Sequence, residues 1–458
     1  MVETDDAVGS EDSADHAWRR WPIVALVALP LLLWWVSWYP GMLSSDSIAQ
    51  LADIEAGEFG NEIPAIHSIL VWLLTRVWRS PAVLTLIQVV AMVALLAAFV
   101  RRGVAIGMPR WFAGAVAIAF AWMPAVGATT IALEVQVAQT LVAIWLLVEL
   151  MDLAPDPAAY LADPWSQARL GGSLALAWLL DHGGVVVVVV VAGVLLFGMR
   201  RRAELLLVPL GGALALALLV QGPLYAAFSV DRQMHPVGEA FAPEVAAVYH
   251  HDPGWFDESD RNLLTAVADL RVWEEAYRCG DGAALLEDRE FDPGAIHSRP
   301  GAYRGLVTRA TVTHPLTVLG HRVCAASMLF IPAPPVGVQF ATYVYNVPPN
   351  ALGIERSTRW EQGFNLTKAI LVRVDQPDRL WLFWRPAIFL WPALAAAAVL
   401  FVRRRSIAWP GLALAAYALL AFATMREPSF REAFTVYALG FLGVALWWPA
   451  VAGFRGSR

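Results

Sequence analysis

No charged side chain interrupts residues 81–100, PAVLTLIQVVAMVALLAAFV, and two arginines, Arg101 and Arg102, follow them directly. A helix needs about 20 apolar residues to cross the ~30 Å hydrocarbon core of a bilayer, so this run predicts a transmembrane helix. Of the 458 residues, 58% are apolar and 16% are charged, whereas soluble domains carry about 25% charged residues. The sequence therefore predicts a polytopic integral membrane protein.

Nine more apolar runs occur along the chain. In lipid, a helix satisfies the backbone hydrogen bonds of such a run, so even the polyvaline at 185–191 is predicted to be helical. We therefore expect an all-α fold with about ten transmembrane helices. The further runs are Trp21–Trp38, Trp111–Thr130, Val135–Met151, Leu170–Leu180, Gly184–Met199, Leu205–Gln221, Leu380–Val402, Trp409–Thr424 and Ala433–Ala452.

Clusters of arginine lie in every second connection between these runs. The positive-inside rule assigns such clusters to the cytoplasm. We therefore expect a multi-pass protein of the cell membrane, with both termini cytoplasmic and the long segment 223–379 extracytoplasmic. The clusters are Arg19-Arg20, Arg101-Arg102 with Arg110, Arg200–Arg202, Arg403–Arg405, and Arg455 with Arg458.

The runs divide the chain into four regions. Residues 1–20 are acidic and polar, and we expect a disordered cytoplasmic tail. Residues 21–222 are expected to form an N-terminal transmembrane domain whose first outer loop carries the candidate site. We expect residues 223–379 to form a large, mostly helical and irregular extracytoplasmic insert, and residues 380–458 to form C-terminal transmembrane helices.

The polar segments contain further helix signals. Ser259 is a candidate N-cap for a helix whose apolar residues recur at helical spacing as far as Tyr277, and Gly280 can end it. Residues His314–Phe330 have an amphipathic pattern that indicates a helix lying along the membrane surface. In the first outer loop, Ile63–Trp78 is apolar but interrupted by polar residues, which indicates another interfacial helix.

Both cysteines, Cys279 and Cys324, belong to the extracytoplasmic segment. An oxidising compartment permits a disulfide between them, whereas a buried thiol is the alternative for Cys324 in its apolar helix. We predict the disulfide. The chain has no Cys-His spacing typical of a structural zinc site.

Carboxylates stand at the outer ends of two spans. Asp46 follows the first span in PGMLSSDSIAQ, residues 40–50, and Gln50 lies one helical turn further on. Glu134 lies in the turn between the third and fourth spans. The simpler interpretations are that Ser45 or Asp46 only caps the helix that follows, and that Glu134 is a solvated turn residue. Charged groups beside hydrocarbon are costly, however, and a carboxylate pair can take a proton from a hydroxyl or hold a divalent cation.

The motifs together resemble those of the GT-C superfamily, polytopic glycosyltransferases that use polyprenyl-phosphate sugars, in its bacterial branch. Asp46, Gln50 and His67 are similar to the family's D-S-x-x-Q…H-P pattern, with Ser68 in place of the proline, and Glu134 stands where the family usually has aspartate. Two later segments add to the resemblance. They are Thr313-His314-Pro315 with Arg322, similar to H-P-x-x-Y-x-x-x-R, and Phe430-Arg431-Glu-Ala-Phe434, similar to R-Y-x-x-P.

The resemblance implies an inverting glycosyltransferase acting at the extracytoplasmic face. It implies that Asp46 is the catalytic base and that Glu134 assists it, through the acceptor or through a divalent cation such as Mg²⁺ or Mn²⁺. The implied partners are membrane lipids, a polyprenyl-phosphate-linked sugar and a glycan, lipid or protein acceptor, and no nucleic acid. The implied substrate-binding residues are Gln50, His67, Arg322, Arg426 and Arg431, since guanidinium groups match phosphate oxygens.

Three other functions stay open at this stage. A transporter or flippase would need polar or Gly/Pro-broken segments at mid-membrane depth, and the spans here are nearly free of charge in their middles. A lipid-linked oligosaccharide polymerase or ligase also carries a large external loop, but it uses Arg and His rather than an early Asp. A catalytically inactive scaffold is the third alternative.

Overall fold

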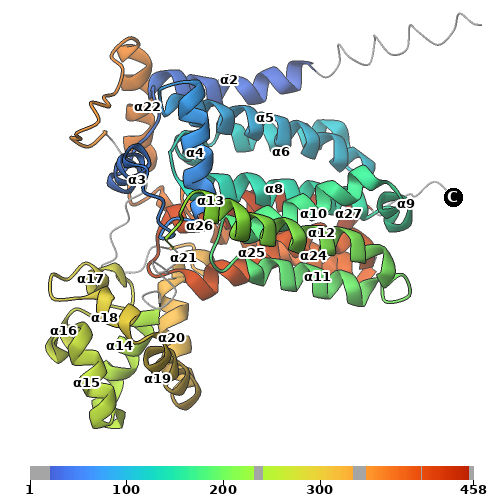
Figure 1. Ribbon diagram of the computed structural model, residues 1–458. Coiled ribbons are helices and arrows are strands. Elements are labelled where there is room, and N and C mark those ends of the chain that lie inside the picture. The colour runs from blue at the N-terminus through green and yellow to red at the C-terminus, as the bar shows by residue number, and fades with distance from the viewer. Residues whose placement is uncertain (1–20, 232–240, 334–346, 404, 453–458) are drawn as a thin grey trace, which may run out of the picture.

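The computed structural model describes residues 21–231, 241–333, 347–403 and 405–452 (Figure 1). Within these ranges the chain is helical, and its β structure is limited to one isolated bridge between Met42 and Ala132. The all-α prediction is confirmed. The predicted tail at 1–20 and the arginines at 19, 20, 404, 455 and 458 lie outside the described residues.

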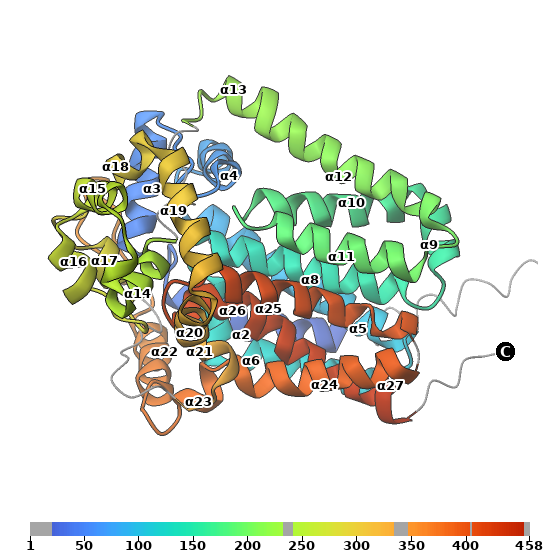
Figure 2. The same cartoon turned by 90° about the horizontal axis from the view of Figure 1, so that it is seen from below.

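Most of the predicted runs form helices that lie side by side in one bundle (Figures 1 and 2). Its largest core contains residues from the first span to the last. The bundle helices are α2 (Trp21–Ser37), α5 (Ala82–Ala105), α6 (Arg110–Trp122), α7 (Pro124–Thr130), α8 (Val135–Leu153), α10 (Pro164–Leu179), α11 (Val185–Gly198), α12 (Leu207–Leu219), α24 (Ala387–Arg403), α25 (Pro410–Thr424) and α26 (Phe430–Gly443).

Four helices in the described residues are long and apolar enough to cross a bilayer. They are Ala82–Ala105, Val135–Leu153, Ala203–Ala227 and Phe430–Val451. Helices α6 and α7 make a fifth candidate that is bent by 66°, because Pro124 begins a new helix there. Five more apolar helices are shorter, among them the polyvaline helix α11. The protein is an integral membrane protein, and the count of ten spans stays a prediction.

The bundle has two distinct ends. Helices α3 (Ser45–Ala56) and α4 (Ala65–Val77) lie at one end, which we call the site end. The start of α2 and the last helix, α27 (Trp447–Ala452), lie at the opposite end (Figure 1). Arg101 and Arg102, in the last turns of α5, are at that opposite end as well. This placement agrees with the alternation of the arginine clusters, and the side of the membrane that each end faces stays a prediction.

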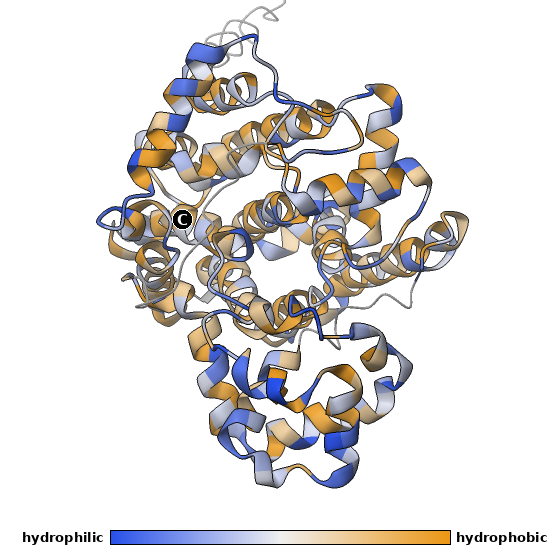
Figure 3. Cartoon of the chain, turned by 90° about the vertical axis from the view of Figure 1, so that its left-hand side faces the viewer, coloured by the Kyte–Doolittle hydropathy of each residue, from blue (hydrophilic) through white to orange (hydrophobic). Residues whose placement is uncertain are grey.

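The long segment between α13 (Tyr225–Ala227) and α24 does not pack as one unit. Residues 242–325, which we call the outer cluster, surround a core of their own that includes Phe256, Trp273 and Tyr303. Helix α22 (Glu361–Val374) instead packs against α2, and the Trp38 indole donates a hydrogen bond to Thr367 Oγ1 at 2.9 Å. In Figure 3 the bundle is mainly hydrophobic, whereas the outer cluster alternates between hydrophilic and hydrophobic segments.

The outer cluster contains shorter helices than the sequence predicts. The helix expected from Ser259 to Tyr277 begins after Asp257, whose side chain caps it, and breaks at Ala268. Asp269 then caps a separate helix. An aspartate accepts hydrogen bonds from the first backbone N–H groups of a helix, and two of them here divide one predicted helix into two. The two helices are α15 (Glu258–Val267) and α16 (Leu270–Glu275).

The predicted helix His314–Phe330 is also divided. Pro315 begins α20 (Pro315–Ala325), and the residues before it, for which no helix was predicted, form α19 (Pro300–Thr313). A break at Ala326 separates α20 from α21 (Ser327–Phe330). The disulfide that the sequence predicts is present between Cys279 and Cys324, with Cα atoms 5.8 Å apart. It ties α20 to the chain that follows α16.

Candidate functional site

Backbone pairing brings the first outer loop beside the turn that precedes α8. The Met42 amide donates to the Ile131 carbonyl at 2.9 Å, and the Leu133 amide donates to the Met42 carbonyl at 3.0 Å. Gly41 makes this approach possible, because its φ is +136° and a Cβ there would lie 2.7 Å from Thr85 Cγ2. The pairing fixes where the two carboxylate-bearing segments lie relative to each other.

Two serines at the start of α3 hold Glu134. Ser44 is the N-cap of α3, and it exchanges side-chain and backbone hydrogen bonds with Ser47 in a capping box. The Ser44 hydroxyl also donates to Glu134 Oε1 at 2.6 Å. The Ser47 hydroxyl donates to the Leu133 carbonyl at 2.7 Å. The sequence pattern predicts neither role, because the usual capping box has Glu or Gln, not Ser, three residues after the cap.

Arg431 joins the two predicted catalytic carboxylates. Its Nη1 atom lies 2.7 Å from Asp46 Oδ2 and 3.8 Å from Glu134 Oε2. The arginine is in the first turn of α26, directly after Phe430, which is buried. We call Asp46, Glu134 and Arg431 the acid–arginine cluster. The structure therefore brings together charges from three segments that are far apart in the sequence.

The two carboxylates have different surroundings. The Asp46 side chain is 57% exposed, whereas that of Glu134 is 14% exposed. Burial raises the pKa of Glu134, although the Arg431 charge and the Ser44 hydrogen bond oppose that rise. A molecule arriving from solvent can therefore reach the Asp46 carboxylate more easily than that of Glu134.

Gln50 and His67 form a buried pair between α3 and α4. Gln50 Nε2 lies 3.0 Å from His67 Nδ1 and donates to Ser68 Oγ at 2.9 Å. Burial lowers the pKa of His67 to about 4, so the imidazole is neutral at physiological pH. Helix α4 runs across the site end, roughly perpendicular to the bundle (Figure 1). The pair ties α4 to α3, the helix that carries Asp46, and its predicted contact with substrate stays a prediction.

Arg322 and Arg426 lie near the acid–arginine cluster but bond elsewhere. Arg322 is buried, forms an ion pair with Glu244 and donates from Nη1 to the Met425 carbonyl at 3.1 Å. The backbone amide of Arg426 donates to Glu432 Oε2 at 3.3 Å. Arg322 thus connects the outer cluster to the turn that precedes Arg431. The ion pair with Glu244 has no local sequence signal, because the two residues are far apart in the chain.

A buried carboxylate at the opposite end of the bundle has a structural explanation. Glu149 in α8 accepts hydrogen bonds from Trp145 Nε1 at 3.0 Å and from Tyr160 Oη at 2.5 Å. It also accepts from Arg169 Nε at 3.1 Å. A charge in a membrane helix suggests function by default, but this one is neutralised and fully bonded. It joins α8 to α10 and to the short helix α9 (Pro157–Ala162).

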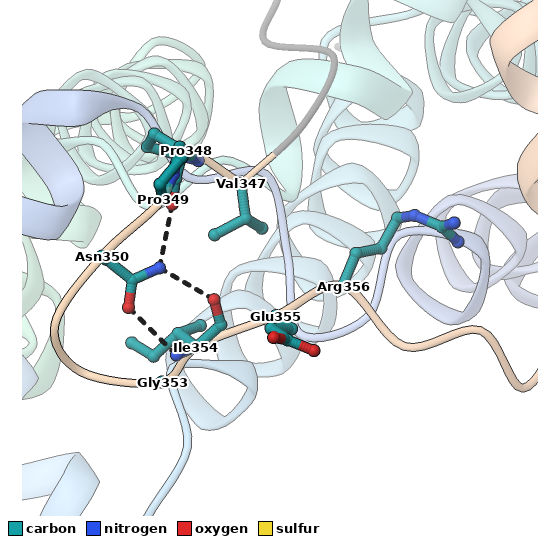
Figure 4. Close-up of a pocket in the computed structure, with 8 residues that line it drawn as sticks. All are labelled: Val347, Pro348, Pro349, Asn350, Gly353, Ile354, Glu355 and Arg356. Carbon is teal, nitrogen blue, oxygen red and sulfur yellow. Dashed lines mark hydrogen bonds between the residues drawn. The ribbon is translucent and has the colours of Figure 1, made fainter.

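Two pockets lie close to the first outer loop. One, of about 540 Å³, is lined by residues 347–350 and 353–356, and Asn350 shapes it by bonding to Pro348 and Ile354 (Figure 4). The amide of Ser357 donates to the Tyr39 carbonyl at 2.8 Å, which holds this segment beside the loop. The other pocket, of about 380 Å³, is apolar and lies between α2 and Trp360. Neither pocket is lined by the acid–arginine cluster.

The residues present fit a divalent cation poorly. The part of the chain that the structure describes contains no group of three or more His, Cys, Asp or Glu side chains arranged to hold a metal ion. Asp46 and Glu134 are two oxygen donors, and Arg431 lies against both of them. A cation would have to displace the guanidinium group, since it needs six or more oxygen ligands of its own.

Comparisons with known proteins give limited information. No protein-family model matches the sequence, and no curated protein matches it either. Two solved structures of ArnT from Cupriavidus metallidurans are similar, one bound to undecaprenyl phosphate and one in the apo state. Both are 16% identical to this chain, cover 94% of it and 77% or 78% of their own length, and give TM-scores of 0.34 and 0.36. At these scores the alignment pairs no individual residues.

Proposed function

We propose that this protein transfers a sugar from a polyprenyl-phosphate carrier to an acceptor hydroxyl at the site end of the bundle. The observation that carries the proposal is the approach of Arg431 to both Asp46 and Glu134, at 2.7 Å and 3.8 Å. Charged side chains beside hydrocarbon are unfavourable in free energy. The convergence of three charged side chains from separate segments is therefore typical of a functional site. The sequence resemblance to GT-C glycosyltransferases supports the same reaction.

Asp46 is the base in this proposal. Its carboxylate takes the proton from the acceptor hydroxyl as the acceptor oxygen bonds to the anomeric carbon of the sugar. The bond between that carbon and the phosphate oxygen breaks, and the polyprenyl phosphate leaves with the electron pair. This single displacement inverts the configuration at the anomeric carbon. The exposure of Asp46 supports the role, because the acceptor must reach it from outside.

Arg431 binds the carrier phosphate in this proposal. A guanidinium group donates two parallel hydrogen bonds to phosphate oxygens, which stabilises the charge that develops on the leaving group. The same group now lies against Asp46, so an arriving phosphate competes with Asp46 for it. Glu134, held by Ser44, keeps Arg431 in place during that exchange. Arg426 lies near this turn and is proposed as a second contact for the phosphate.

The lipid part of the substrate requires an apolar surface that reaches the site end. The pocket lined by Leu29, Leu32, Leu33, Val36 and Trp360 is such a surface on the outer face of α2. Its position supports a polyprenyl donor. We further propose that the site end is extracytoplasmic, that both termini are cytoplasmic, and that the acceptor is a glycan, a lipid or a protein. A metal ion has no step in this mechanism, because Arg431 supplies the positive charge.

Binding of the carrier tests the proposal before the sugar is known. The protein in lipid nanodiscs is titrated with polyprenyl phosphate and with the matching polyprenol. Native mass spectrometry then measures the fraction of the protein that carries each ligand. We expect binding of the phosphate in clear excess over the alcohol, and a several-fold loss in Arg431→Lys because a point charge replaces the planar fork. Arg261→Lys, at an exposed position in the outer cluster, is the matched control.

Equal binding of the phosphate and the alcohol by the unsubstituted protein would contradict the proposal. If the phosphate binds, a panel of polyprenyl-phosphate sugars then identifies the donor by release of polyprenyl phosphate in the presence of membrane extracts. A protein that binds the carrier and moves it across the bilayer without releasing sugar would be a flippase.

A further inference from the structure

Helix α20 presents an apolar face to its surroundings. Leu316, Leu319 and Val323 recur at spacings of three and four residues, so they lie along one side of the helix. They are 81%, 49% and 46% exposed. Each of them thus keeps roughly half or more of its surface uncovered by the residues that the structure describes. Val312, in the last turn of α19, is exposed nearby.

The two ionisable residues of α20, His321 and Arg322, lie on its buried face. Arg322 is paired there with Glu244, and His321 Nδ1 lies 3.2 Å from the Tyr277 hydroxyl. Both side chains are buried. A helix on the surface of a soluble domain has the opposite arrangement, with charged residues outward and apolar residues inward. The reversal indicates that the outward face of α20 meets an apolar environment.

The position of α20 identifies that environment. Helices α19 and α20 form the side of the outer cluster that is nearest to the bundle, and α20 runs perpendicular to the bundle helices (Figures 1 and 2). A helix with this direction lies parallel to the plane of a membrane that the bundle crosses. The chain then continues through α21 to the bundle, where Trp391 Nε1 donates to the Phe330 carbonyl at 3.0 Å.

The exposed face of α20 is continuous with the lipid-facing surface of the bundle. Ile331 directly follows α21 and is 44% exposed, and Trp391 on α24 is 52% exposed. Tryptophan is enriched at the interface between hydrocarbon and headgroups, so Trp391 marks the level of that interface. The apolar face of α20 therefore begins where the apolar surface of the bundle ends.

We propose that α20 lies in the interfacial layer of the bilayer, with Leu316, Leu319 and Val323 inserted between the lipid chains. The helix thereby fixes the outer cluster against the membrane beside the turn that precedes Arg431. This attachment is independent of the reaction that the protein catalyses, so it holds whether or not the proposed function is right. The partner in this proposal is the lipid bilayer. The test below would also reveal a protein partner or a second copy of this chain on the same face.

Site-directed fluorescence in nanodiscs tests the proposal on the full-length protein. The sequence has two cysteines, and both are in the disulfide. A thiol introduced by Leu319→Cys is therefore the single labelling site. Its matched control is Ala266→Cys, on the exposed face of α15 in the same cluster. Each labelled protein is quenched in turn by iodide in water and by nitroxide groups attached high on the lipid chains.

We expect the probe at position 319 to be quenched several-fold more by the lipid nitroxide than the probe at 266, and several-fold less by iodide. Equal iodide quenching at both positions would overturn the proposal, because α20 would then face water. Protection from both quenchers would overturn it too, since protein would then cover the helix. Val323→Cys repeats the measurement should labelling at 319 disturb the fold, and non-reducing electrophoresis verifies that the native disulfide is intact in each variant.

Discussion

Asp46→Asn separates a catalytic base from a simple ion-pair partner. Asparagine keeps the shape of the side chain and one oxygen for Arg431, but it cannot take a proton. Loss of a positioned base costs about 10²–10⁴-fold in rate, which corresponds to roughly 3–5 kcal/mol of barrier. The Asp46–Arg431 pair is 57% and 42% exposed, and exposed pairs of this kind contribute about 0–1 kcal/mol to stability. The expected loss of activity is therefore several times larger, in free energy, than the expected loss of stability.

The assay uses the donor identified by the polyprenyl-phosphate panel. Initial rates of sugar transfer are measured for the unsubstituted protein, Asp46→Asn and Asp53→Asn, and thermal unfolding is followed by the fluorescence of the 21 tryptophans. Asp53 is an exposed carboxylate on the same helix, so Asp53→Asn matches the charge change without touching the cluster. We expect near-normal unfolding for both variants and loss of transfer for Asp46→Asn alone.

Two results would refute this reasoning. Asp46→Asn could retain more than about a tenth of the transfer rate. The fold-loss in rate would then be smaller than the loss of a general base causes. Alternatively, Asp53→Asn could lose as much activity as Asp46→Asn, which would show that the surface charge of α3 matters and not the base.

Three further predictions concern the surroundings of the site. Ser44→Ala removes both a helix cap and a hydrogen bond to Glu134, so we expect it to lower stability by about 1–3 kcal/mol, and an unchanged unfolding midpoint would contradict the capping role. Burial raises the pKa of Asp181, in the turn between α10 and α11, from 3.8 to about 6, so the folded state binds the extra proton and stability falls as pH rises through that window. The unfolding temperature of Asp181→Asn should depend less on pH between about 4 and 6 than that of the unsubstituted protein. Dialysis against EDTA should leave the transfer rate unchanged, whereas a loss of transfer that added Mg²⁺ or Mn²⁺ restores would show that a cation replaces Arg431 between the carboxylates.

The helical bundle could be predicted because its determinants are local. Apolar runs such as 81–100 have one satisfactory conformation in lipid, and the structure has helices at all the predicted runs. Their number as full spans could not be predicted, because several are too short to cross a bilayer unaided. The predicted helix ends in the outer cluster were wrong for a different reason. Asp257 and Asp269 are the caps in place of Ser259, and sequence spacing alone does not rank competing caps.

The site could be predicted only in outline. Position in the topology placed Asp46 and Glu134 at ends of spans, and Arg431 at the end of a third. The contacts between them depend on backbone pairing and on Ser44, which no periodicity reveals. The ion pair of Arg322 with Glu244 was not predicted, and the phosphate contact that its motif suggests stays a prediction. Partner choice of that kind is decided by tertiary packing.

The pairing of Met42 with Ala132 is made by main-chain atoms, and this has a consequence for variation and engineering. A main-chain clamp does not depend on which side chain each residue carries, apart from the glycine at position 41. The apolar residues that fill the bundle can therefore be exchanged for others of similar volume while the loops keep their register. A protein designer could replace core residues of the spans by others of similar volume and still inherit the relative placement of the two segments that carry the carboxylates.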